Sequence, residues 1–305
     1  MSVTMIPFQA GEARLDWLEL CAALEAGHRL PRAEIADSFL YRDPDTLLSR
    51  AAWIDGMGMA VKTATIFPRN PDQGKPLING AVALFSDTGG TLAAIVDFHL
   101  VTKWKTAGDS LYAATRLARP DSEEILIIGA GTVGRSLFEA YRAGFPEARF
   151  SVWNRTRANA AKMAAECPGL RVADDLETAV RGADIVTSAT MSTEPILKGA
   201  WLRPGQHIDL IGAYRPDMRE ADDAALGRAR LFVDCFDTTV GHIGEIQIPL
   251  EAGTITRSDL IADFYEPEKF HRRSDEEITL FKNGGGAHLD LMTSTYILDA
   301  WQGAE

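Results

Sequence analysis

A glycine-rich turn near the middle of the chain constrains the fold more than any other feature. The segment Gly129-Ala130-Gly131-Thr132-Val133-Gly134 directly follows the apolar run Ile125 to Ile128 and opens a segment of helical character. In such a turn the first glycine permits the tight bend, the second lets the backbone approach a pyrophosphate, and the third allows the helix to pack closely on the strand. The helix N-terminus offers N–H groups and the positive end of its dipole to phosphates. All six residues are therefore expected to contact a bound dinucleotide.

The sequence around the turn alternates between short apolar runs and helical segments, as in a parallel sheet with crossover helices. The expected strands are Ile125 to Ile128, Arg149 to Trp153, Asp184 to Ser188, Ile208 to Ile211 and Leu231 to Asp234. The expected helices are Val133 to Arg142, Arg157 to Glu166, Leu176 to Val180 and Ala221 to Arg228. Glycine turns also occur in proteins that bind nothing, but the agreement of strand, turn, helix and later βα units predicts an α/β fold with a doubly wound, Rossmann-type parallel sheet.

The residues before this region follow a different pattern. Segments typical of β-strands at Ala60 to Ile66, Ile78 to Phe85 and Leu92 to Asp97 are separated by a proline-rich loop and a glycine turn, which predicts an antiparallel sheet. A helix is expected from Thr106 to Leu117, ending just before a proline-containing stretch that marks a domain boundary. A further helix is expected from Ala287 to Trp301, where it can pack back on the first domain.

Composition excludes several classes of protein. A chain of 305 residues with 46% hydrophobic residues is long enough for two domains with full cores. Its formal charge of −12 would repel nucleic-acid phosphates and anionic membrane surfaces. The three cysteines have no CxxC spacing, so neither a disulfide framework nor a metal site is expected. No apolar run approaches the ~18 residues needed to span a bilayer, and the start lacks the pattern of a signal peptide, so we expect a cytoplasmic protein.

The residues after the second strand decide which dinucleotide is preferred. NAD sites keep an Asp or Glu about 20 residues after the glycines for the ribose hydroxyls, whereas this chain has Asn154, Arg155 and Thr156. An arginine and two small hydrogen-bonding side chains suit a 2′-phosphate, so we expect NADPH, with NADH less favoured. The alternative is that Arg155 is a solvated arginine at the start of a helix capped by Thr156. Further cofactor contacts are expected after later strands, where ligands bind in open sheets. These contacts are Thr190, Met191 and Gly212. The alternative is that these residues only pack their loops against the sheet.

Several cations precede the Rossmann region in unusual positions. Lys62 interrupts an otherwise apolar run, and Lys103 and Lys105 flank Trp104 near the expected helix start. A buried lysine needs a partner, although a solvated outer face is the usual explanation for a lone lysine in a strand. Together with Arg50, and without any candidate metal cluster, these lysines predict a pocket for a small anionic substrate.

These segments resemble the ornithine cyclodeaminase and μ-crystallin family. The resemblance rests on Val61-Lys62, residues 89–97, Leu100 to Ala107, Gly129-Ala130-Gly131, Val152 to Thr156, Glu194 to Leu197 and Arg215 to Glu220, which follow the family's order along nearly the whole chain. It implies a homodimer with a discontinuous α+β substrate-binding and dimerisation domain of residues 1–118 with 288–305. It also implies an NAD(P)-binding Rossmann domain of residues 119–287, and a substrate pocket lined by Lys62 and Lys105.

Departures from the family pattern narrow the expected activity. Lys105 stands where the family has an arginine that holds the substrate carboxylate, and lysine supplies the charge without the bidentate fork. Gly212-Ala213-Tyr214 lacks the aspartate with which ornithine cyclodeaminases handle the amino group. The stretches Trp104 to Ser110 and Gly285 to Met292 are most similar to the bacterial Δ1-pyrroline-2-carboxylate reductase, or ketimine reductase, branch.

The resemblance thus implies NADPH-dependent reduction of a cyclic imino acid, Δ1-pyrroline-2-carboxylate or its six-membered homologue Δ1-piperideine-2-carboxylate, to L-proline or L-pipecolate. Arg50 and Lys105 would hold the carboxylate with help from Asn79, and Lys62 would lie near the ring nitrogen. Lys62 donates a proton efficiently only if its surroundings make it more acidic. His288 is the alternative donor, although a lone histidine near a terminal helix is more often structural. The alternative activities are ornithine cyclodeamination, dehydrogenation of alanine, and non-catalytic NADPH binding as in relatives of μ-crystallin character.

Overall fold

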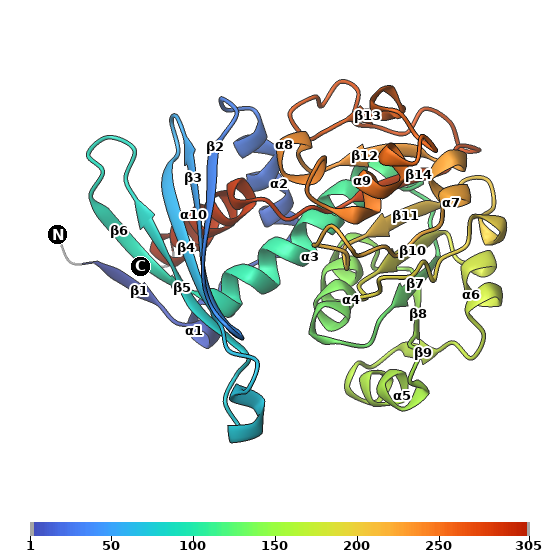
Figure 1. Cartoon of the computed structure of the whole chain (residues 1–305), viewed down its shortest axis with the longest axis horizontal. Helices are drawn as coiled ribbons and strands as arrows, with labels where there is room; N and C mark the ends of the chain where they lie inside the picture. Colours follow the sequence, from blue (N-terminus) through green and yellow to red (C-terminus); the bar gives the residue numbers. More distant parts are fainter. Residues whose placement is uncertain (1–2, 304–305) are drawn as a thin grey trace. The chain divides into compact units, whose positions relative to one another are not determined.

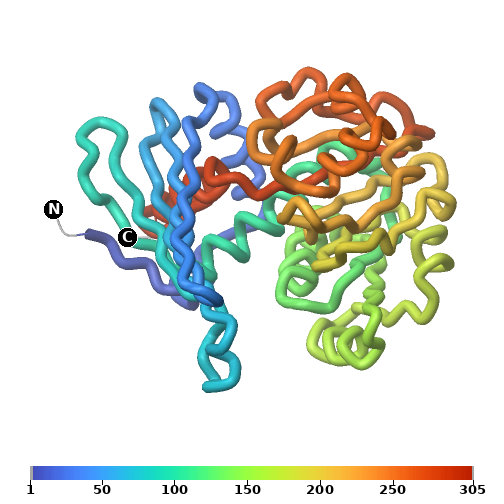
Figure 2. The backbone as a smooth tube through the Cα atoms, in the orientation of Figure 1, coloured from blue at the N-terminus to red at the C-terminus, as the bar shows by residue number. Residues whose placement is uncertain are grey.

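The computed structural model describes residues 3–303 and divides into two compact units. Unit 1 comprises Met1–Lys105 with Gly286–Glu305, and unit 2 comprises Thr106–Gly285. Unit 1 is discontinuous in sequence, whereas unit 2 is one uninterrupted stretch, as the colours of Figures 1 and 2 show. The sequence predicts the boundaries at 118/119 and 287/288 instead, and residues 1–2 and 304–305 of the predicted first domain lie outside the described residues.

The helix α3 (Phe98–Leu117) contains the first boundary between the units. The sequence predicts this helix only from Thr106. It begins earlier because the Oδ1 of Asp97 accepts hydrogen bonds from the N–H groups of His99 and Leu100, at 2.8 and 3.0 Å, and so caps the first turn. Lys105 consequently lies inside the helix and not at its start. Among the described residues no helix, α3 included, is both long and apolar enough to cross a membrane.

In the described part of unit 1, six strands form one sheet in the order β1-β6-β5-β4-β3-β2. Neighbouring strands are antiparallel, except that β1 is parallel to β6. The strands are β1 (Thr4–Ile6), β2 (Glu34–Arg42), β3 (Asp45–Ile54), β4 (Gly58–Ile66), β5 (Ile78–Phe85) and β6 (Leu92–Asp97). The last three lie where the sequence predicts strands. The sequence does not predict β1, β2 or β3. The strand β2 is exposed along nearly its whole length and shows no alternation of apolar and polar residues.

Helices cover one face of this sheet. The terminal helix α10 (Ala287–Gln302) packs against β3, β4 and the helix α2 (Trp17–His28), and a short helix α1 (Phe8–Glu12) follows β1 (Figure 1). On β4, Lys62 and the residues two positions before and after it are buried, whereas Val61 and Thr63 are partly exposed. Because successive side chains of a strand point to opposite faces, Lys62 belongs to the covered face.

Unit 2 is described in full and contains an eight-stranded sheet in the order β13-β12-β14-β11-β10-β7-β8-β9, with all pairs parallel. The strands are β7 (Glu124–Ile128), β8 (Arg149–Trp153), β9 (Leu170–Val172), β10 (Ile185–Ser188), β11 (His207–Leu210), β12 (Arg230–Val233), β13 (Leu260–Ala262) and β14 (Thr279–Lys282). The predicted Rossmann-type sheet is confirmed. The sequence missed β9, β13 and β14, which have only three or four residues each and therefore give no periodic signal.

The helices of unit 2 follow the strands. They are α4 (Thr132–Gly144), α5 (Arg157–Glu166), α6 (Leu176–Gly182), α7 (Asp223–Arg228), α8 (Phe236–Thr239) and α9 (Gly244–Glu251), of which α8 and α9 are not predicted by the sequence. Fully buried apolar side chains such as Leu126, Val186 and Leu210 pack on Val180 and Leu226 of the helices. The four segments predicted to contact a dinucleotide follow the neighbouring parallel strands β7, β8, β10 and β11, so they lie at one edge of the sheet.

Candidate active site

The glycine turn between β7 and α4 combines two closely packed glycines with one that faces open space. Gly129 has φ of +111°, and a Cβ there would lie 2.7 Å from the carbonyl oxygen of Ala189. A Cβ on Gly134 would overlap the carbonyl oxygen of Gly129. Around Gly131, in contrast, no atom of the described residues lies within 4 Å of where a Cβ would be. Two of the glycines are thus needed for packing, while Gly131 leaves open space at the N-terminus of α4 where a phosphate fits. Ala130, Thr132 and Val133 complete the turn.

Asn154 joins this turn to the end of β8. Its Oδ1 accepts a hydrogen bond from the N–H of Ala130 at 3.1 Å, and its Nδ2 donates to the carbonyl oxygen of Thr156 at 2.9 Å. Arg155 is exposed and has no ion-pair partner among residues 3–303, whereas Arg157 pairs with Asp174 at 2.8 Å. Thr156 occupies the N-cap position of α5, but its side chain makes no capping hydrogen bond. Arg155 is therefore available to a ligand phosphate, and Asn154 holds the two loops together.

A buried carboxylate that the sequence analysis did not single out links the ends of β10 and β11. One oxygen of Glu220 accepts hydrogen bonds from Ser188 Oγ at 2.6 Å and from both the backbone N–H and the Oγ1 of Thr190 at 2.8 Å. The other oxygen accepts from the N–H of Gly212 at 2.6 Å. Burial raises the pKa of Glu220, and the nearby charge of Lys282 opposes that shift. Two predicted cofactor contacts, Thr190 and Gly212, are thus held by one side chain, while Met191 beside them is 77% exposed.

In unit 1, a second buried carboxylate gathers two of the predicted cations. Lys62 on β4 is 7% exposed, and its Nζ lies 2.9 Å from Oδ1 of Asp290 on α10 and 2.9 Å from Thr102 Oγ1 on α3. The ammonium also lies 4.7 Å above the ring of Phe98. Lys105 is equally buried, with its Nζ 3.9 Å from the same oxygen of Asp290. Asp290 is not among the site residues predicted from the sequence, although a carboxylate within an otherwise apolar helix signals a cationic partner.

Arg50 joins this group through strand register, and Asn79 does not. Arg50 on β3 lies directly opposite Lys62 on β4, so both side chains belong to the same face, and Arg50 also pairs with Asp37 at 2.9 Å. Asn79 on β5 lies opposite Thr65, which is three positions after Lys62 on β4, and therefore on the other face of the sheet. Its Nδ2 donates to the carbonyl oxygen of Pro76 at 3.2 Å. The structure does not bring Asn79 to the predicted substrate cations, because an odd offset along a strand reverses the face.

His288 lies on α10 two residues before Asp290 and is completely buried. Burial, together with the charge of Lys105, lowers the pKa of His288 to about 3. Its ring meets that of His28 edge-on, with the centroids 5.4 Å apart. At neutral pH the imidazole is uncharged, which argues against the acid role that the sequence suggests for it. Asp290, in contrast, stays ionised: burial favours its protonated form, but Lys105, Lys62 and Arg50 outweigh it and lower the pKa.

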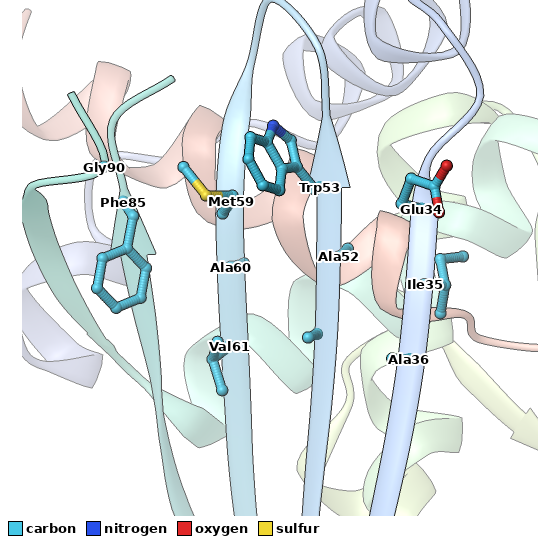
Figure 3. A pocket seen from close by; sticks show the side chains of 11 residues that line it. Glu34, Ile35, Ala36, Ala52, Trp53, Met59, Ala60, Val61, Phe85 and Gly90 are labelled. Atoms are coloured by element: carbon cyan, nitrogen blue, oxygen red, sulfur yellow. The ribbon is translucent and has the colours of Figure 1, made fainter. Parts of the chain in front are cut away.

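A groove of about 460 Å³ lies on the opposite, exposed face of the same sheet. Figure 3 shows Trp53, Met59 and Phe85 side by side on three neighbouring strands at this groove, with Val61 further along β4. None of the residues predicted to bind substrate lines it. The groove is therefore a separate apolar feature of unit 1.

The chain is similar in sequence and in structure to known proteins. The family model described as ornithine cyclodeaminase/mu-crystallin family matches residues 52–305. A Δ1-pyrroline-2-carboxylate reductase of Paracoccus denitrificans is 50% identical over 292 residues, covering 93% of this chain and 92% of the relative. The Thermococcus litoralis Δ1-pyrroline-2-carboxylate reductase, solved with NADH and L-proline, superposes with a TM-score of 0.90 at 25% identity, covering 99% of this chain and 98% of the other. An archaeal alanine dehydrogenase, solved as a dimer with bound NAD, also gives a TM-score of 0.90, at 27% identity and with 100% and 97% of the chains covered. The chain belongs to the ornithine cyclodeaminase/mu-crystallin family.

Proposed function

We propose that this protein reduces a cyclic imino acid, Δ1-pyrroline-2-carboxylate or Δ1-piperideine-2-carboxylate, to L-proline or L-pipecolate with NADPH. That the chain is a nicotinamide-dependent oxidoreductase acting on a C=N bond follows from its family and from the 50% identity to a reductase of this kind along nearly its whole length. The observation that supports the substrate class is the pair of buried lysines, Lys62 and Lys105, with the partly exposed Arg50 on the same sheet face as Lys62, because such cations suit one small carboxylate.

The reaction requires positioning more than acid chemistry from the protein. When bound, the cofactor supplies a hydride to C2 of the protonated imine, and the electron pair of the C=N bond moves to nitrogen. Both lysine ammonium groups lie within 4 Å of the same carboxylate oxygen of Asp290, so the substrate carboxylate meets cations that are already ordered. The glycine turn at α4 and the loops fixed by Glu220 would hold the cofactor. Thr190, Met191 and Gly212 remain the proposed contacts beyond the turn.

The preference for NADPH rests on the end of β8. No carboxylate stands at residues 154–156 to accept ribose hydroxyls, and Arg155 is exposed there without an ion-pair partner among the described residues. The two solved relatives above contain NADH and NAD, so a nicotinamide cofactor is common to them. The proposal for this chain goes beyond them only in the 2′-phosphate of NADPH. A guanidinium suits a phosphate better than it suits a ribose hydroxyl.

We also propose a homodimer, in which a second copy covers the exposed face of the unit 1 sheet. Register places four exposed apolar side chains on this face, namely Met5, Leu40, Leu47 and Trp53. Apolar side chains exposed on one face of a sheet are typical of interaction surfaces. The archaeal alanine dehydrogenase of the same fold was solved as a dimer.

A turnover panel tests the activity. Purified protein is assayed with Δ1-pyrroline-2-carboxylate, Δ1-piperideine-2-carboxylate, L-ornithine and L-alanine, following both nicotinamide absorbance and ammonia. Consumption of NADPH with either imine is the expected result. Ammonia release from L-ornithine without net redox change would instead identify a cyclodeaminase, and NADP⁺ or NAD⁺ reduction with L-alanine a dehydrogenase. Cofactor binding without turnover of any substrate would identify a non-catalytic binding protein.

A further inference from the structure

We propose that Asp290 binds the ring N–H of the substrate, so that it selects the protonated, iminium form of the imino acid. This inference rests on the proposed function and assigns a substrate contact beyond the cations already named. It begins from the two oxygens of the Asp290 carboxylate, which have different surroundings.

The Oδ1 atom is occupied by the cations. It lies 2.9 Å from Lys62 Nζ and 3.9 Å from Lys105 Nζ. The Oδ2 atom is buried as well, yet it has no hydrogen-bond partner among residues 3–303. Asp290 is only 1% exposed, and leaving a buried charged acceptor without a donor is costly. The unsatisfied oxygen therefore points to a donor that arrives with a ligand.

The chemistry of the proposed substrate supplies such a donor next to the groups already placed. In a cyclic 2-imino acid the carboxylate and the ring nitrogen are both attached to C2. A site that holds the carboxylate with the cations Arg50, Lys62 and Lys105 must therefore receive the nitrogen close by. The iminium N–H carries a positive charge, and an acceptor that is itself charged makes the stronger hydrogen bond. Asp290 is ionised, buried and in contact with these lysines, which are the properties that this position requires.

The same carboxylate explains how two lysines and a cationic substrate coexist. Arg50, Lys62 and Lys105 repel an iminium, and without a counter-charge the neutral imine would be favoured, although it accepts hydride less readily. Asp290 is a buried anion that touches both lysines, and it offsets this repulsion.

Two flat ring acids test whether Asp290 binds a ring N–H or only positions Lys62. Pyrrole-2-carboxylate has a ring N–H beside its carboxylate, whereas furan-2-carboxylate has the same shape with an oxygen acceptor there. Their dissociation constants are measured by calorimetry on the NADPH-saturated protein. Wild type is expected to prefer the pyrrole by about 10-fold to 150-fold, the range of one charge-assisted hydrogen bond. The variant Asp290→Asn is expected to reduce that preference to less than about 3-fold.

The matched control is Thr102→Val, which removes the other hydrogen-bond partner of Lys62 and leaves Asp290 in place. It is expected to weaken both acids equally and to keep the preference for the pyrrole. If wild type binds the two acids equally, or if Asp290→Asn keeps the preference, Asp290 does not bind the ring N–H. The wild-type comparison needs no variant, so it stands even if Asp290→Asn is unstable. Imine turnover measured in parallel separates the two proposals. If the protein turns over an imine but does not prefer pyrrole-2-carboxylate to furan-2-carboxylate, only the role of Asp290 is overturned. If it neither turns over an imine nor binds either acid, both proposals are overturned.

Discussion

The buried ring of His288 makes a pH-dependent contribution to stability. Its pKa is lowered by burial and by Lys105 to about 3 in the folded protein, whereas an unfolded histidine titrates near 6.5. The unfolded state therefore binds more protons between these values. The contribution of His288 is complete above about pH 6.5 and is lost as the pH falls toward 3.

We therefore expect His288→Leu to flatten the pH dependence of unfolding. Urea denaturation at pH 7 and pH 5 should give a loss of stability on acidification that is smaller in the variant by roughly 1–2 kcal/mol, since each unit of pH in this window is worth about 1.4 kcal/mol at most. The exposed His99 provides the control, and His99→Gln should keep the wild-type difference. Equal pH dependence in all three proteins would show that His288 is not held neutral.

Arg155 carries the proposed cofactor preference. Replacing it with alanine should lower kcat/KM with NADPH by roughly 10-fold to 150-fold and change the value with NADH little, because only NADPH has the phosphate. Arg157 is the matched control, since it is exposed on the same segment but paired with Asp174. Arg157→Ala should leave the ratio of the two cofactors unchanged. An unchanged ratio in Arg155→Ala would mean that this arginine is merely solvated.

Single residues were predictable from the sequence to the extent that their role is local. The six residues of the glycine turn are where a strand-turn-helix pattern puts them. The cations Arg50, Lys62 and Lys105 were recognised by their unusual positions and by resemblance. The contact between Lys62 and Asp290 could not be derived from the sequence, because these residues are 228 positions apart and only the fold brings them together. Glu220 was not predicted for the same reason, since its hydrogen-bond partners lie at the ends of two strands, β10 and β11.

At the scale of elements, the glycines of the turn from β7 into α4 differ in their surroundings. Gly134 is closely packed, whereas Gly131 faces open space. Gly134→Ala places a Cβ against the carbonyl oxygen of Gly129, so we expect a loss of about 1–3 kcal/mol of stability in urea unfolding. Gly131→Ala fills open space instead, so its stability should stay within about 1 kcal/mol of wild type. Its affinity for NADPH, measured by fluorescence titration, should fall 10-fold or more because the new methyl group occupies the proposed phosphate position. Wild-type affinity in Gly131→Ala would show that the phosphates do not bind at this turn.

The elements themselves were predictable where they are long and periodic. The strands β5, β6 and β8 and the helix α5 have the predicted bounds, and they carry clear apolar patterns or follow clear turns. The start of α3 was missed because Asp97 both ends β6 and caps the helix, with no turn residue to mark the change. The strand β14 was missed because it is short, ends in the buried Lys282 and takes its place between β11 and β12 out of chain order. Local propensity cannot reveal a strand whose stability comes from its neighbours.

At the scale of the whole molecule, the net charge of −12 and the cationic site are compatible. The overall charge disfavours polyanionic partners. The cations of the proposed substrate site are local: Lys62 and Lys105 are buried, and Arg50 lies on the same face of the unit 1 sheet as Lys62. The same sheet leaves its other face exposed and apolar, with the groove beside Trp53 and Met59 (Figure 3). One sheet can therefore serve the substrate on one side and a second copy of the chain on the other.

The exposed face makes a prediction about assembly. Light scattering after size exclusion should give twice the chain mass of 33.2 kDa for wild type. Trp53 is 50% exposed on this face, and Trp53→Glu would place a charge against the apolar surface of the second copy, so the variant should elute as a monomer at micromolar concentration. Leu18 on α2 is 49% exposed and lies outside the sheet, so Leu18→Glu should remain a dimer. A wild-type monomer, or a Trp53→Glu variant that stays dimeric, would mean that this face does not join two copies, and the apolar groove would then need another occupant.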